Sequence, residues 1–197
     1  MSSEKNQAKK SGWKEAIVVY LHDAVYLMIS VLLIFLLIFR IIVVSGGSMK
    51  MTLLNGDYLL LLNNVFYSEP KQGDVVVLSK HSYDNGAPIV KRVIATEGQR
   101  VNIDFEEGIV YVDGIALDEP YASTSTTKNR GMEFPLTVEE NCIFVLGDNR
   151  KVSRDSRDPV IGLVDEREVL GKALFLFFPG PDEDTEERDF DRIGAIE

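Results

Sequence analysis

A long apolar stretch near the start of the chain separates two regions with different hydrophobic patterns. Residues 24–39 carry no charge, and apart from Arg40 the stretch stays apolar as far as Val44. At about 1.5 Å per residue, a helix of this length measures roughly 31 Å, which matches the hydrocarbon core of a bilayer. We therefore predict a transmembrane anchor over residues 16–44, preceded by a disordered, lysine-rich tail over residues 1–15.

The flanking charges predict how this anchor is oriented. Four lysines precede the apolar stretch, so the positive-inside rule places the tail in the cytoplasm and the rest of the chain outside. A cleaved secretory signal is the alternative, because Ser45 and Gly47 are small enough to resemble a cleavage site. The apolar run is longer than the roughly 7 to 15 residues of such signals, which favours a retained anchor.

Beyond residue 45 the pattern changes to short β-rich runs separated by turn residues, which predicts a mainly β domain over residues 45–180. Asp113-Gly114 is typical of a two-residue hairpin, and the polar residues 121–131 are typical of a mobile loop. Residues 181–197 form an acidic C-terminal segment, which we interpret as a solvated connector with at most a final packed turn. The predicted strands are residues 57–62, 74–79, 88–96, 100–105, 109–117, 142–146 and 171–178.

Charge and cysteine content exclude several functions. The formal net charge is −10 overall and −12 over residues 45–197, so this region would repel nucleic acid. One cysteine, Cys142, permits no intramolecular disulfide, and its apolar neighbours indicate a buried small residue rather than a nucleophile. The two histidines, His22 and His81, lie far apart in the sequence, so we expect no zinc site, and no cofactor is indicated.

Ser48 is the first candidate for a catalytic residue, because it lies in a glycine-containing turn directly after the apolar stretch. A serine hydroxyl is a poor nucleophile unless a neighbouring base takes its proton. His22 falls at the inner membrane interface, and His81 lies in a polar, turn-rich stretch. Lys91 is the other candidate for this base.

Lys91 lies in a predicted strand, where Ile89 and Val93 share its face. A lysine has an ordinary pKa of about 10.4, and a useful base at pH 7 needs a pKa roughly 2 to 3 units lower. Burial on an apolar face can supply this shift. Taken alone, however, the pattern favours a lysine at a sheet edge with its ammonium in water.

A third segment, residues 147–157, follows a predicted buried strand and contains two acids, three arginines and two serines. A solvated turn would have such a composition. A loop that is rich in donors and acceptors and emerges from an apolar strand is also a usual place for a site to be supported.

At these three segments the sequence resembles the bacterial type I signal peptidases, which are membrane-anchored serine proteases with a Ser-Lys dyad. Residues 45–53 resemble their nucleophile segment, Lys91-Arg92-Val93 their general-base segment, and residues 147–157 their support loop. The order, the spacing and the anchor agree over nearly the whole chain. The single anchor and the short outer domain are more similar to the Gram-positive members.

The resemblance implies a role for each matching residue. Ser48 would attack the scissile carbonyl, its backbone N–H would donate to the oxyanion, and neutral Lys91 would take the proton. The supporting residues would be Ser153 orienting the Lys91 amine, Asp148 bracing Arg92, Asp155 pairing with Arg157, and Met49 lining a shallow pocket for small side chains. The partners would be membrane lipid and the signal peptides of exported preproteins, bound as an added strand.

Two positions depart from the family pattern. Met51 stands where proline is usual, so the turn after Ser48 lacks a fixed φ. Gly46 stands where some members place a hydroxyl that helps the oxyanion hole. These departures leave room for a dedicated processing peptidase or a non-catalytic assembly factor for pilus or surface proteins; soluble self-cleaving Ser-Lys repressors are disfavoured by the anchor.

Overall fold

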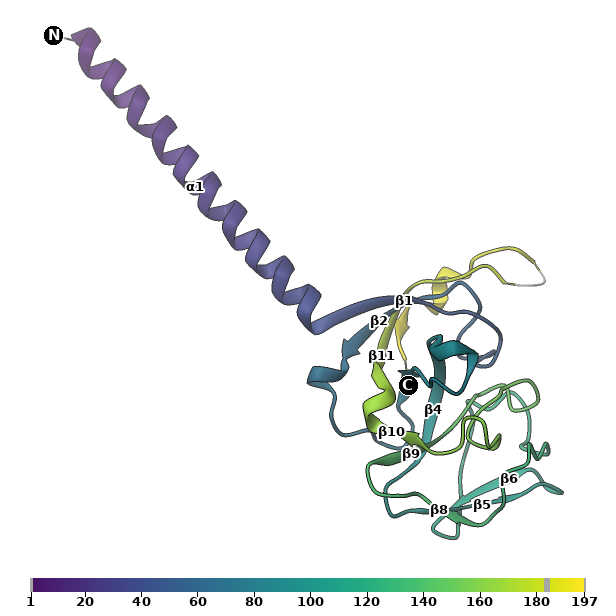
Figure 1. Cartoon of the computed structure of the whole chain (residues 1–197). Helices are drawn as coiled ribbons and strands as arrows, with labels where there is room; N and C mark the ends of the chain where they lie inside the picture. Colours follow the sequence, from purple (N-terminus) through teal and green to yellow (C-terminus); the bar gives the residue numbers. More distant parts are fainter. Residues whose placement is uncertain (1, 183–184, 197) are drawn as a thin grey trace. The chain divides into compact units, whose positions relative to one another are not determined.

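The chain folds as one long helix followed by a β-rich part (Figure 1), in a computed structural model that describes residues 2–182 and 185–196. The two parts are separate compact units that divide at Ile38, and each is described by itself. Helix α1 spans Ser2–Ile38. Its portion Ala16–Ile38 is long and apolar enough to cross a membrane, and the apolar window is not buried against protein. The helix includes residues 2–15, where the sequence predicted a disordered tail; extending an existing helix requires no new nucleus.

The predicted anchor is too long at its outer end. Strand β1 (Phe39–Val43) follows the helix directly and pairs with β2 (Tyr58–Asn63), from Phe39 opposite Leu62 to Val43 opposite Tyr58. Residues 41–44 are all β-branched, and such side chains favour a strand once a partner strand is available. Hydropathy alone does not distinguish these residues from the membrane segment.

The larger sheet contains Lys91 in one of its strands, and all its described strand pairs are antiparallel. Its strand order within the described residues is β1-β2-β11-β3-β4-β9-β10, with β12 paired to β11. The strands not yet given are β3 (Val75–Leu78), β4 (Ile89–Thr96), β9 (Cys142–Leu146), β10 (Val164–Asp165), β11 (Val169–Phe178) and β12 (Gly194–Ala195). Strand β4 therefore lies inside the sheet, between β3 and β9.

A smaller sheet has the order β7-β6-β5-β8. It contains β5 (Arg100–Asp104), β6 (Ile109–Val112), β7 (Ile115–Ala116) and β8 (Leu136–Thr137). Asp113 and Gly114 connect β6 to β7 with φ values of 52° and 80°, which confirms the predicted hairpin. Strands β8, β10 and β12 have two residues each, too few for a pattern to predict. The 3-10 helices are η1 (Asn64–Phe66), η2 (Asp84–Gly86), η3 (Glu166–Glu168) and η4 (Phe190–Arg192).

Within the described residues three apolar clusters make up the core, and the central strands β3, β4 and β9 of the larger sheet are buried on both faces. Val75 and Val77 of β3 belong to a first cluster with Met49 and Leu53, whereas Val76 and Leu78 belong to another. This alternation is that of a strand covered on both sides. In β4, Ile89 and Val93 share one cluster and Val90 faces another, as the pattern predicts; a bulge between Val93 and Ala95 then interrupts the alternation.

Candidate active site

The turn that carries Ser48 is held by the loop that follows β9. The backbone N–H of Asn149 donates to the Ser48 carbonyl at 2.9 Å, and its side-chain amide donates to the Gly47 carbonyl at 3.0 Å. Ser48 itself is half-buried. Two segments about a hundred residues apart in the sequence are thereby fixed against each other at the serine.

Lys91 contacts Ser48 directly. Its Nζ lies 2.9 Å from Ser48 Oγ and donates to the Val90 carbonyl at 2.9 Å. Lys91 is 3% exposed because β4 lies inside the sheet, so the interpretation of a solvated edge lysine is wrong. Burial lowers the pKa of Lys91 to about 8, against the opposing negative charges of Asp155 and Asp148.

The other candidate groups lie elsewhere. His81 is exposed between β3 and β4. Cys142 is half-buried at the first residue of β9 and packs beside the apolar cluster that contains Val101 and Phe144, where burial raises the pKa of its thiol. A raised thiol pKa suppresses the reactive thiolate. Among these candidates in the part of the chain that the structure describes, Lys91 is the one that contacts Ser48 Oγ.

Asp148 and Arg92 form a buried, bidentate ion pair next to Lys91. Arg92 donates from Nε and Nη2 to the two carboxylate oxygens of Asp148 at 3.0 and 2.9 Å. Its Nη1 donates to the Gly73 carbonyl at 2.8 Å, and its guanidinium lies 4.0 Å from the ring centre of Tyr121. This geometry fixes the β4 backbone beside Lys91 in a single orientation.

Asp155 and Arg157 form a second pair, with neither side chain exposed. Arg157 donates from Nε and Nη2 to the two carboxylate oxygens at 2.8 Å each, and from Nη1 to the Lys128 carbonyl at 3.1 Å. The backbone N–H of Gly147 also donates to Asp155, at 3.1 Å. The pair thus connects both ends of the support loop to the predicted loop 121–131.

Arg150 and Glu119 also support the site, although the sequence pattern did not single them out. Arg150 donates to both Glu119 oxygens, at 2.9 and 2.7 Å, and to the Thr126 hydroxyl at 2.7 Å. The only available signal was the place of Arg150 in the donor-rich loop, since nothing in the pattern relates it to Glu119. These contacts anchor the stretch that we predicted to be a mobile loop.

Ser153 does not make the contact that the resemblance implied. Its hydroxyl donates to the Arg154 carbonyl at 3.4 Å, and within the described residues it makes no hydrogen bond to Lys91. Ser153 is nevertheless buried at the site, packed against Gly147. A Cβ added at Gly147 would collide with the Ser153 side chain and would lie 2.6 Å from the Ser48 carbonyl oxygen, so only glycine fits this approach.

Two features next to Ser48 bear on substrate binding. Met49 is 1% exposed and packs in the first apolar cluster, so its predicted contact with substrate stays a prediction. The backbone N–H of Ser48 makes no hydrogen bond within the residues described, so this donor is available to an oxyanion.

Met51 has a strained backbone. Its φ is +95° and its side chain is 75% exposed. It is the third residue of a turn closed by the Thr52 N–H and the Met49 carbonyl at 3.0 Å, a position that favours glycine when φ is positive. Proline, fixed near −65°, cannot adopt this conformation, so the departure from the family pattern accompanies a different local turn.

We expect Met51→Gly to raise the free energy of unfolding by about 1 kcal/mol, because glycine removes this strain. Met51→Pro is expected to lower it. Chemical denaturation of the whole protein in detergent measures both effects. Val152→Gly is the control, since Val152 is also exposed beside the site but has no positive φ, and it should be slightly destabilising. A destabilised Met51→Gly would contradict the assignment of strain.

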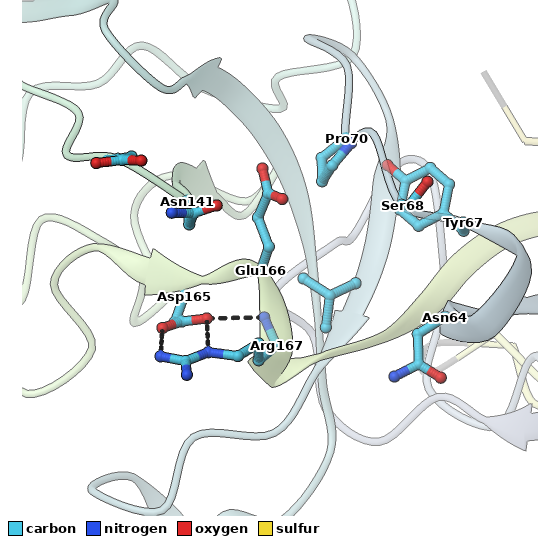
Figure 2. Close-up of a pocket in the computed structure, with 10 residues that line it drawn as sticks. Asn64, Tyr67, Ser68, Pro70, Asn141, Asp165, Glu166 and Arg167 are labelled. Carbon is cyan, nitrogen blue, oxygen red and sulfur yellow. Dashed lines mark hydrogen bonds and ion pairs between the residues drawn. The ribbon is translucent and has the colours of Figure 1, made fainter.

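A cavity of about 570 Å³ is lined by the residues drawn in Figure 2. Its lining includes Asn64, Tyr67 and Glu166, together with the Asp165–Arg167 ion pair, and includes neither Ser48 nor Lys91. Burial and the neighbouring Glu97 and Asp165 raise the pKa of Glu166. This cavity is therefore distinct from the Ser48–Lys91 site.

Comparison with known proteins identifies the family. The chain matches the family described as Signal peptidase, peptidase S26 over residues 17–178. It is 33% identical to Signal peptidase I of Bacillus licheniformis, over 91% of this chain and 96% of the relative. It is 35% identical to Signal peptidase I S of Bacillus subtilis (strain 168), with the same two coverages. A crystal structure of a signal peptidase I from Enterococcus faecalis V583 is 31% identical and has a TM-score of 0.43, covering 53% of this chain and 97% of that one.

These matches define a serine peptidase, consistent with a mainly β domain that presents a half-buried serine. The chain belongs to the signal peptidase family, among the bacterial type I enzymes.

Proposed function

We propose that this protein cleaves signal peptides from exported preproteins, with Ser48 as nucleophile and Lys91 as general base. The observation that carries the proposal is the 2.9 Å contact between Lys91 Nζ and Ser48 Oγ in a site where Lys91 is almost fully buried. A nucleophile and a base within hydrogen-bond distance, with the pKa of the base lowered, are what covalent catalysis requires.

In this mechanism neutral Lys91 accepts the Ser48 proton as Oγ attacks the scissile carbonyl. The Ser48 N–H donates to the oxyanion that forms. Lys91, now protonated, gives the proton to the leaving amine, and an acyl group remains on Ser48. Lys91 then takes a proton from the water that attacks the acyl group and returns it to Ser48 Oγ as the ester bond breaks, which releases the cleaved signal peptide and restores neutral Lys91.

The same proposal includes attachment to the membrane, with the β-rich part outside the cytoplasm. It is supported by the apolar portion Ala16–Ile38 of α1, whose 23 residues measure roughly 34 Å as a helix, sufficient for a bilayer. The lysines before it favour a cytoplasmic N-terminus. Such an anchor would hold Ser48 near the membrane surface, where a signal peptide leaves its own apolar helix.

The pH dependence of cleavage tests the proposed base. We expect kcat/KM to rise tenfold per pH unit up to about pH 8 and then to level off, because only neutral Lys91 accepts the proton. At pH 7 a pKa of about 8 leaves roughly a tenth of the lysines neutral, about 200 times more than the ordinary pKa would leave. Circular dichroism at each pH is the control for folding. A midpoint near pH 6.5 would instead indicate histidine, and a flat profile between pH 6 and 9 would exclude Lys91 as the base.

A further inference from the structure

The last part of the chain, where the sequence predicted a solvated connector with at most a final packed turn, packs against the turn that carries Ser48. The C-terminal strap is defined here as residues 188–196. Strand β12 within it pairs with β11, and the N–H of Ile196 donates to the Leu174 carbonyl at 3.1 Å. The Ile196 side chain packs against the first apolar cluster, which contains Met49 and Leu53 on either side of the turn.

Arg192 is the polar contact between this strap and the Ser48 turn. It donates from Nη1 and Nη2 to the two carboxylate oxygens of Asp57, at 3.0 and 2.6 Å. Its Nη2 also lies 3.4 Å from the Thr52 carbonyl oxygen. Thr52 is four residues after Ser48, so the strap reaches the nucleophile turn itself.

Asp57 closes the loop in which Ser48 lies. It is fully buried, and its carboxylate also accepts the N–H groups of Leu54 and Gly180, at 2.7 Å each. Its carbonyl accepts the Val44 N–H at 2.8 Å, which brings together the two ends of the loop. A buried carboxylate needs a partner cation, and Arg192 supplies it.

Thr52 connects the loop that Asp57 closes to Lys91, the proposed base. Its hydroxyl donates to Asp148 at 2.5 Å, and Asp148 pairs with Arg92, the neighbour of Lys91. Thr52 is therefore held at its carbonyl by Arg192 and at its hydroxyl by the acid that orients the β4 strand. The position of the Ser48 turn relative to Lys91 depends on both contacts.

We propose that the C-terminal strap positions the nucleophile turn for catalysis and that Arg192 is the positioning residue. The inference rests on the proposed role of Ser48. Loss of Arg192 loosens the turn and lengthens the Ser48–Lys91 contact, although within the described residues the hydrogen bonds of the Arg192 side chain are with Asp57 and Thr52 and not with Ser48 or Lys91. Small displacements of reacting groups cost large factors in rate, so the effect belongs in kcat rather than KM.

The test is steady-state cleavage of a detergent-solubilised preprotein by the full chain and by Arg192→Gln. We expect kcat to fall about tenfold with KM within about twofold of the unmodified protein. Arg192→Lys should be intermediate, because one ammonium can bind Asp57 but cannot also reach Thr52 as the guanidinium does. Arg167→Gln is the matched control, since Arg167 pairs with Asp165 at an exposed site, and it should leave both constants unchanged.

An unchanged kcat in folded Arg192→Gln, or a rise in KM that accounts for the whole loss, would overturn the inference. Should Arg192→Gln not fold, Arg192→Lys decides: a kcat about threefold lower at constant KM supports positioning, and an unmodified kcat refutes it. Ser48→Ala is measured in the same assay. Activity retained in Ser48→Ala would refute the proposed function, whereas inactive Ser48→Ala beside fully active Arg192→Gln would refute the strap alone.

Discussion

Ser48→Ala and Lys91→Ala are each expected to lower the rate of preprotein cleavage by at least about 1,000-fold. The first removes the atom that attacks. The second removes the one base that, within the described residues, lies against Ser48 Oγ. The double variant should be no slower than either single one, because a nucleophile and its base act as a unit. The measurement is cleavage of a detergent-solubilised preprotein by the intact chain.

Lys80→Ala is the matched control for Lys91→Ala. Lys80 is also partly buried and donates to Glu168 at 3.1 Å and to the Leu163 carbonyl at 2.7 Å, with no contact to Ser48. Its removal should leave the rate within about twofold, since such a contact contributes modestly and only to stability. Full activity in Lys91→Ala would place the base elsewhere and make His81→Ala the next variant. Failure of the unmodified chain to cleave would favour a dedicated processing peptidase with a narrow substrate range or an assembly factor.

The sequence predicted the strands of the larger sheet because their signal is local. The apolar pattern predicts buried strands over residues 74–79 and 142–146, and β3 and β9 lie within these two ranges. The burial of Lys91 had no such signal. It arises because β3 and β9, distant from each other in sequence, pair on either side of β4. Alternation in one strand identifies a face but not whether the strand lies at an edge.

The parts that the sequence did not predict depend on contacts between distant segments. The last residues of the apolar run form a strand because β1 pairs with β2. Arg192 pairs with Asp57, which lies more than a hundred residues earlier in the sequence. The Ser153 hydroxyl shows a different limit. The family pattern brings it to the site, but the rotamer that the structure adopts directs it to the Arg154 carbonyl.

Lys91, the proposed general base, is expected to destabilise the fold. Lys91→Met should abolish cleavage and raise the free energy of unfolding at pH 7 by about 3 kcal/mol. Methionine fills a similar volume without a charge, and a pKa lowered by about 2 units corresponds to that cost. Chemical denaturation of the whole protein in detergent measures this difference in the free energy of unfolding. Lys80→Met is the control and should not raise the free energy of unfolding.

The pH dependence of this difference separates burial of a charge from any other cause. Between about pH 8 and 10.4 the unfolded chain still binds the proton that folded Lys91 has lost, so the unmodified protein gains stability as pH rises. Below that window the deficit is constant, and above it the deficit disappears. The advantage of Lys91→Met should therefore be full at pH 7 and absent at about pH 11. A variant less stable than the unmodified protein at pH 7 would mean that the hydrogen bonds of Lys91 to Ser48 and Val90 outweigh its desolvation, and that this lysine supports the fold as well as the reaction.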